Sequence, residues 1–111
     1  MIRLSGELGA ETERHGVAVL AIDPGWMSTA MSAYLADSTQ GLRWTPSARS
    51  LLGTKAHVPP SRAADLVVTL ATGQADDLSG RYLTVWDDVN DLLSRTEEIR
   101  RSDLHRVRLR R

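Results

Sequence analysis

The sequence contains no cysteine. This absence excludes disulfides, thiolate nucleophiles and zinc sites built on cysteine, and it is typical of proteins in a reducing compartment. No apolar run reaches the roughly 18 residues that a membrane-spanning helix needs, and the N-terminus has no apolar segment like that of a secretory signal. The sequence therefore predicts a cytoplasmic protein with no membrane partner.

An excess of charge of either sign is also missing. Lys and Arg together number 14, as do Asp and Glu, so the formal net charge is zero. Without a field of one sign, attraction of the whole molecule to nucleic acid is not expected. The composition of the 111 residues, 41% hydrophobic and 25% charged, indicates one soluble domain at most. Its function is expected to depend on local sites.

Two apolar segments predict strands of a parallel sheet. Residues 17–22 (VAVLAI) are apolar on both alternating faces, as in a strand covered by helices on either side, and residues 81–86 (RYLTVW) form the second strand. Two strands alone do not make a stable sheet. Either further strands are hidden in the sequence, or the chain is the rear part of a larger α/β domain.

Helical periodicity accounts for much of the remaining chain. In the first helix, Gly6 and Gly9 should each cost roughly 1 kcal/mol relative to alanine, so we expect a neighbour to pack closely against these bare positions. Residues 30–58 have no clean period and predict a long functional loop with one or two short helical turns. The expected helices cover residues 2–14 with a stop at Gly16, Pro60 to a stop at Gly73, and about 88–101, before a basic tail.

A turn with unusual chemistry follows the first expected strand. In open parallel sheets, ligands bind beyond the carboxyl ends of the strands. Pro24 fixes its own φ, and Gly25 would let a flat ring approach the backbone without a Cβ in the way. Thr29 adds a hydroxyl and an amide. The residues alone also allow a simpler interpretation, in which Pro24 and Gly25 form only a turn and Thr29 caps a helix.

The order of these features resembles the C-terminal half of the short-chain dehydrogenases/reductases. In that family a helix with a pattern like LxxELAxE…HGV leads to a strand that ends in Pro-Gly, and a threonine follows four residues after the glycine. A mobile substrate loop, a helix beginning Pro-x-x-x-Ala and a closing strand introduced by SGRYL come next. The matching residues here are Glu11, His15-Gly16-Val17, Pro24-Gly25, Thr29, Pro60 to Ala64, and Ser79-Gly80-Arg81-Tyr82-Leu83.

The resemblance implies both a fold and a function. The fold would be a C-terminal fragment of a Rossmann-like, doubly wound parallel sheet, with residues 1–111 as a partial domain of about two strands and three to four helices. The complete enzyme would be a homo-oligomeric oxidoreductase that transfers hydride between NAD or NADP and a small organic alcohol or carbonyl. Residues 30–58 would be its substrate-lid loop. The residues implied at the nicotinamide edge are Pro24, Gly25, Trp26 and Thr29, and those implied at the substrate are Met27, Met31 and Tyr34.

The catalytic motifs of that family do not occur in these residues. No glycine-rich phosphate motif is present, and neither Tyr34 nor Tyr82 has a lysine four residues later. The resemblance places the catalytic Ser, Tyr and Lys just before residue 1, so no catalytic residue is predicted here. We expect the isolated chain to be inactive and to bind NAD or NADP poorly. The alternative is a non-catalytic interaction module that pairs, through residues 2–14 and 81–86, with a full-length relative or a separate front half.

Other candidate sites have plainer interpretations. His15, His57 and His105 lack the spacing of metal ligands, so no metal site is predicted. The aromatic residues of the 30–58 region either pin the loop to the core or contact substrate. Two acidic pairs adjoin turns and are expected to cap or solvate them; they are Asp76-Asp77 and Asp87-Asp88. The terminal arginines predict a solvated tail or a subunit contact; they are Arg100, Arg101, Arg106, Arg108, Arg110 and Arg111.

Overall fold

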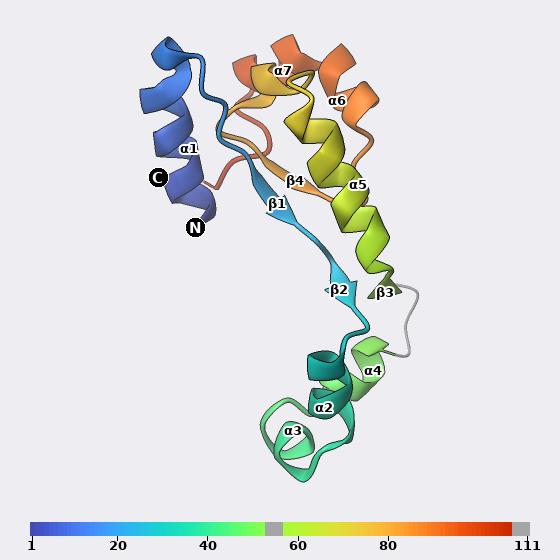
Figure 1. Ribbon diagram of the computed structural model, residues 1–111. Helices are drawn as coiled ribbons and strands as arrows, with labels where there is room; N and C mark the ends of the chain where they lie inside the picture. Colours follow the sequence, from blue (N-terminus) through green and yellow to red (C-terminus); the bar gives the residue numbers. More distant parts are fainter. Residues whose placement is uncertain (53–56, 108–111) are drawn as a thin grey trace. The chain divides into compact units, whose positions relative to one another are not determined.

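The computed structural model describes residues 1–52 and 57–107 (Figure 1). The chain divides into two compact units: the first comprises Met1–Asp23 and Leu66–Arg111, and the second comprises Pro24–Asp65. Each unit contains one pair of parallel strands. Residues 53–56 of the predicted lid, and Arg108, Arg110 and Arg111 of the predicted tail, lie outside the described residues.

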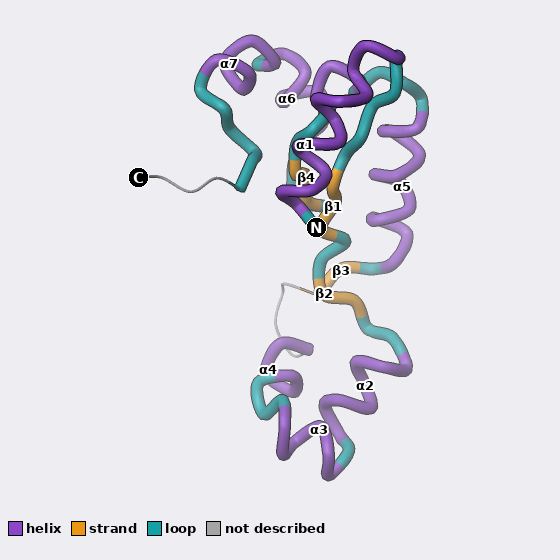
Figure 2. The backbone as a smooth tube through the Cα atoms, turned by 90° about the vertical axis from the view of Figure 1, so that its left-hand side faces the viewer, coloured by secondary structure: helices purple, strands orange, loops and turns teal. Residues whose placement is uncertain are grey.

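The sheet of the first unit consists of β1 (Ala21–Asp23) and β4 (Tyr82–Thr84), which lie side by side in Figures 1 and 2. The strands pair in parallel from first residue to last, so that Ile22 lies opposite Leu83. Leu83 is fully buried, and it belongs to the core of this unit. The expected α/β class with parallel strands is therefore confirmed.

Both strands are shorter than the apolar segments that predicted them. Val17 is 52% exposed, and the Val19 N–H donates to the Ser79 hydroxyl at 3.0 Å instead of to a strand carbonyl. The side chains of β1 are half-buried, whereas the sequence predicted burial on both faces. Regular pairing thus begins only at residue 21, because the turn before β4 occupies the position that a strand partner of Val19 would take.

Short helices surround this sheet. The predicted first helix is α1 (Ile2–Thr12) continued by the 3-10 turn η1 (Glu13–His15), and Gly16 ends it with a φ of +68°. The single helix predicted over residues 88–101 is divided at Arg95. The remaining elements are η2 (Asp76–Leu78), α6 (Val89–Ser94), α7 (Thr96–Arg101) and α5 (Pro60–Ala71), of which the residues up to Asp65 belong to the second unit.

The core of the first unit comes from elements far apart in the sequence. Fully buried apolar side chains from the η2 region, β4, α6 and α7 meet there, and half-buried leucines and a valine pack around them. The buried set is Ala75, Leu78, Leu83, Leu92 and Ile99, and the surrounding set is Leu20, Leu70, Val89 and Leu93. Asp88 caps α6 by accepting hydrogen bonds from the N–H groups of Asn90 and Asp91, as the sequence predicted for this acidic pair.

Helix α1 packs against the turn at Gly80. A Cβ added at Gly9 would lie 2.7 Å from the backbone nitrogen of Gly80, a distance that real Cβ atoms do not reach. A Cβ added at Gly6 would lie 3.5 Å from the Gly80 carbonyl oxygen, which is an ordinary contact. The close neighbour predicted for the glycines of this helix is therefore confirmed, and Gly9 is the position that requires it.

Residues 102–107, which follow α7, do not form the solvated tail that is one of the two predictions for this segment. The Tyr82 N–H donates to the carbonyl of His105 at 2.8 Å, and a His105 ring nitrogen lies 3.1 Å from the Tyr82 carbonyl. Since the neighbouring residues of β4 bond to β1, these contacts occupy the outer edge of β4. The sequence did not reveal this contact because it joins residues 23 positions apart through backbone groups.

The second unit is mostly helical, although the sequence predicted a loop over residues 30–58. It contains β2 (Trp26–Met27) and β3 (His57–Val58), paired in parallel, and three short helices. These helices are α2 (Ala30–Asp37), α3 (Thr39–Trp44) and α4 (Ala48–Leu52). They bury small residues, Ala36, Gly41 and Ala48, instead of a long apolar stripe, which explains why no helical period is visible in the sequence.

No helix within residues 1–52 and 57–107 has both the length and the apolar character required to span a membrane.

Candidate functional site

The turn after β1 has the backbone that its sequence suggests. Gly25 adopts a φ of +73°, a conformation that side-chain-bearing residues rarely take. Pro24 and Gly25 are half-buried, and the chain continues directly into β2 at Trp26. Glycine is therefore required here by the turn itself, whether or not a ligand approaches it.

Thr29 caps helix α2, as the simpler interpretation of the sequence had it. Its hydroxyl accepts a hydrogen bond from the Ser32 N–H at 3.3 Å, and its own N–H donates to Ser32 Oγ at 2.8 Å. The buried Ser32 hydroxyl also donates to the Met27 carbonyl at 2.8 Å. This reciprocal capping box fixes the residues between β2 and α2. The Thr29 side chain stays at the surface, and its hydroxyl proton has only a long contact, 3.4 Å, to Ser32 Oγ.

His57 supports the same segment from the neighbouring strand. It lies opposite Trp26 in the β2–β3 pair, and its Nε2 accepts a hydrogen bond from the Ser28 N–H at 2.7 Å. An accepting Nε2 carries no proton, so this ring serves as a support for the loop. The sequence singled out His57 only as a metal-ligand candidate, and no spacing rule would have paired it with Ser28.

The indole nitrogen of Trp26 is an unused donor. Nε1 is buried and has no hydrogen-bond partner among the described residues. Buried polar groups are nearly always hydrogen-bonded, and an unsatisfied one costs roughly 1–3 kcal/mol. Among the residues that the sequence predicts at the cofactor, Trp26 is the one whose polar side-chain atom has no partner in the described part of the chain.

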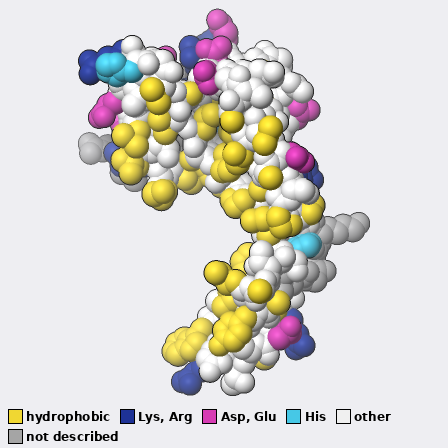
Figure 3. Space-filling view, viewed as in Figure 1, with side chains coloured by type: hydrophobic (Ala, Val, Ile, Leu, Met, Phe, Trp, Pro, Cys, Tyr) yellow, Lys and Arg dark blue, Asp and Glu magenta, His cyan; other side chains and the backbone are white. Residues whose placement is uncertain are grey.

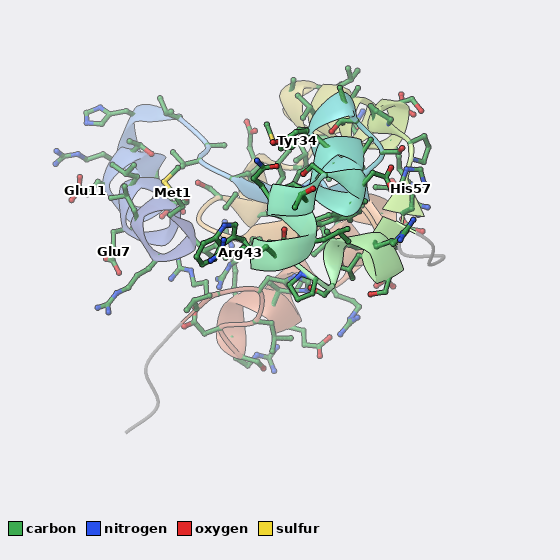
Figure 4. The ribbon with its side chains drawn as sticks, turned by 90° about the horizontal axis from the view of Figure 1, so that it is seen from below. Met1, Glu7, Glu11, Tyr34, Arg43 and His57 are labelled. Atoms are coloured by element: carbon green, nitrogen blue, oxygen red, sulfur yellow. The ribbon has the colours of Figure 1, made fainter. Side chains whose placement is uncertain are left out.

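The predicted substrate residues differ in exposure. Met27 is half-buried in β2, whereas Met31 and Tyr34 are 75% and 57% exposed on α2. Met31 and Tyr34 are three positions apart, so they share one side of the helix. Figure 3 shows hydrophobic side chains at the surface of the α2–α4 region, and Figure 4 shows Tyr34 beside the α2 ribbon. Trp44 is also exposed. The exposure of Tyr34 and Trp44 argues against the role in which these aromatic side chains fasten the 30–58 region to the core.

A second polar pair lies in the first unit, at the sheet. The Tyr82 hydroxyl donates to Asp23 Oδ2 at 3.0 Å, joining β4 to the end of β1. This hydrogen bond raises the pKa of the Tyr82 phenol above its ordinary value, with burial and the negative charges of Asp23 and Asp87 adding to the effect. Sequence reasoning missed the pair, because only the strand register brings two residues 59 positions apart together.

The Tyr82–Asp23 bond predicts a loss of stability in alkali. Because the pKa of Tyr82 is raised by folding, its contribution is fully present below the ordinary tyrosine pKa and is lost as the pH rises through the raised value. The chain has two tyrosines, so in a Tyr34→Phe background only Tyr82 titrates. Phenolate absorbance should then appear at higher pH in the folded chain than in urea. Identical midpoints in the two states would contradict the prediction, and Tyr82→Phe should remove the signal.

Comparison with known proteins finds sequences that are similar to nearly the whole of this chain. It is 31% identical over 109 residues to the short chain dehydrogenase mpl6 of Monascus purpureus, and equally to the short chain dehydrogenase citE of Monascus ruber. Each match covers 98% of this chain and 33% of the relative, so the chain spans about a third of the length of these proteins. No family model and no solved structure matches the chain. The resemblance found in the sequence is thereby confirmed: this chain is related, over nearly all of its length, to part of the short-chain dehydrogenases.

Proposed function

We propose that this chain supplies one wall of the nicotinamide and substrate cleft of an NAD(P)-dependent short-chain oxidoreductase that interconverts alcohols and carbonyls. The names of the two relatives support the reaction class. The glycine-rich motif and the Tyr-x-x-x-Lys motif are not in these residues. The proposed role of the chain is therefore to contribute residues to an active site that other parts of the enzyme complete, and not to catalyse the reaction alone. The C-terminal position within such an enzyme and a cytoplasmic location are parts of the same proposal.

The residues after β1 suit the carboxamide end of a nicotinamide ring. A carboxamide has both donors and an acceptor. The Thr29 hydroxyl, which accepts from Ser32, can still donate its own proton to the carboxamide oxygen, and Trp26 Nε1 can donate to it once the atoms that cover Nε1 move aside. When bound, the nicotinamide would give or take the hydride. The proposed task of Pro24, Gly25, Trp26 and Thr29 is to bind and orient it.

The substrate side of the proposed wall is apolar. Met31 and Tyr34 present exposed apolar surface from α2, and Met27 lies in the adjoining strand. Such surface is normally covered by a ligand or a partner when it is extensive. We therefore propose that residues 30–58, three short helices instead of a loop, contact a partly apolar alcohol or carbonyl substrate.

The observation behind this proposal is that Trp26 Nε1 has no hydrogen-bond partner among the described residues. The proposal can be tested by combining the chain with a polypeptide that supplies the rest of the enzyme. The pure chain should show no NAD(P)H turnover, because no positioned proton donor of the Tyr-Lys type exists in it. Turnover should appear when a polypeptide carrying the first part of a short-chain dehydrogenase is added. Trp26→Phe should lower the restored activity about tenfold, as expected for one lost buried hydrogen bond.

Trp86→Phe is the matched control, because Trp86 is 50% exposed and is not among the proposed cofactor or substrate residues. It should leave the restored activity unchanged. Turnover by the pure chain would contradict the inactivity of the chain, and equal activity of the Trp26→Phe and wild-type chains would contradict the cofactor wall.

A non-catalytic interaction module is the second candidate, and one observation favours it. The apolar residues Met1, just before α1, and Leu4 and Leu8, on α1, recur at helical spacing and are 97%, 55% and 39% exposed. We propose α1 as the contact to a second subunit, either another copy or a full-length relative. The outer edge of β4, the other contact expected from the sequence, is partly taken by His105. Concentration-independent sedimentation as a monomer with a sharp thermal transition would contradict this candidate.

A further inference from the structure

Three arginines line one cavity of about 230 Å³ in the first unit. The cavity lies among the second half of α1, the turn before β4, the end of α7 and the chain that follows α7. Its lining residues are Gly9, Ala10, Glu13, Ser79, Arg81, Arg100 and Arg106. The turn before β4 is at the amino end of the parallel pair, whereas the proposed cofactor residues follow the carboxyl end of β1 in the sequence. This cavity is therefore independent of the proposed function.

Arg81 is buried in the wall of the cavity with much of its donor capacity unused. Its side chain is only 7% exposed. Nη1 donates to Asp103 Oδ1 at 2.9 Å and to the Leu104 carbonyl at 3.0 Å. Within the described residues, Nε and Nη2 donate to no other group. A guanidinium has five N–H donors in a fixed planar fork, so three of these donors have no acceptor among the described residues.

The other two guanidinium groups are held by longer contacts. Arg106 donates from Nε to the Gly80 carbonyl at 3.3 Å and from Nη1 to Asp103 at 3.5 Å. The Nη2 atom of Arg100 lies 3.5 Å from an Asp77 oxygen and 3.9 Å from a Glu13 oxygen. Both of these carboxylates are mostly exposed, so their attraction to Arg100 is weakened by water.

The residues that line the cavity carry three positive charges and one negative charge, whereas Asp103 and Asp77 pair with the same arginines from outside the lining. One partly buried carboxylate, Asp103, is shared between Arg81 and Arg106, and Glu13 is the acidic residue that lines the cavity. The side chains of Arg81 and Arg106 are largely removed from water, which strengthens their attraction to a charge placed between them.

We propose that this cavity binds a small oxyanion of the phosphate class. Planar guanidinium forks match phosphate oxygens two at a time, which a point charge does not. The volume lies below the roughly 300–1,000 Å³ of pockets for drug-sized ligands, so it suits a free anion or a single phosphate group. The bound anion would join the turn before β4, α7 and the chain after α7 through Arg81, Arg100 and Arg106.

The test uses inorganic phosphate and the full chain. Calorimetric titration, with chloride at matched ionic strength as the reference, should show saturable binding of one phosphate per chain. Arg106→Gln should weaken this binding about tenfold, as loss of a charge-assisted hydrogen bond does. Arg100→Gln, on the exposed rim, should weaken it in the same direction and is not expected to disturb folding.

Arg95→Gln is the matched control. Arg95 pairs with Asp91 and Glu98 away from the cavity, so its loss should leave phosphate affinity unchanged. Absence of saturable binding to the wild-type chain would overturn the proposal. Unchanged affinity in both Arg106→Gln and Arg100→Gln would also overturn it, since the arginines would then only fasten the chain after α7.

Discussion

Gly41→Ala should destabilise the second unit by about 3 kcal/mol, the upper part of the range for overpacked sites. A Cβ at residue 41 would overlap the Leu35 carbonyl oxygen and would lie 2.6 Å from the carbonyl carbon. These are backbone atoms of α2, so they cannot turn aside as a side chain would. The gain in helix propensity from glycine to alanine, about 1 kcal/mol, is too small to offset this clash.

The effect can be measured by urea unfolding in a Trp86→Phe background. The remaining tryptophans, Trp26 and Trp44, both belong to the second unit, so their fluorescence reports on that unit. Thr39→Ala, at an exposed position of the same helix, serves as the control and should change stability by less than about 0.5 kcal/mol. Equal stability of the Gly41→Ala and Thr39→Ala chains would show that α2 and α3 do not pack as closely as described.

Gly9→Ala should destabilise the first unit by about 2 kcal/mol. The added Cβ would lie 2.7 Å from the nitrogen and 2.8 Å from the Cα of Gly80. Gly80 has a φ of +78°, so its backbone cannot shift freely without losing the turn that precedes β4. Helix α1 would have to move away from this turn. The loss of stability can be measured by urea unfolding, with far-ultraviolet circular dichroism as the signal.

Gly6→Ala is a matched control on the same helix. Its Cβ would make only ordinary contacts, the nearest at 3.5 Å, so the higher helix propensity of alanine should stabilise the chain by about 0.5–1 kcal/mol. The two substitutions are chemically identical, and only their neighbours differ. Changes of the same sign in both variants would contradict the packing of α1 on Gly80.

The family resemblance and the local signals were readable in the sequence. The helix stop at Gly16 and the cap at Asp88 follow from local chemistry, since each depends on residues close together in the chain. The capping interpretation that the residues left open for Thr29 is what the structure shows, whereas its role at the cofactor stays a prediction. Its partner Ser32 was visible in principle, because a hydroxyl three residues after an N-cap is a capping signal.

The helices of residues 30–58 were not readable in this way. They are short, and their close approach depends on small residues, chiefly Gly41 against Leu35, instead of on an apolar stripe. Helices of this length gain little from propensity alone and depend on tertiary packing. The sequence therefore predicted a loop where the chain forms three helices.

The sequence by itself determined the relationship to short-chain dehydrogenases, the α/β class and the positions of the main turns and caps. Only the tertiary structure decided that Tyr82 bonds Asp23, that Arg81 bonds Asp103, and that Trp26 Nε1 is left without a partner in the described chain. The physical reason is range. Propensity and capping act over a few neighbouring residues, whereas these contacts join residues brought together by strand register and packing.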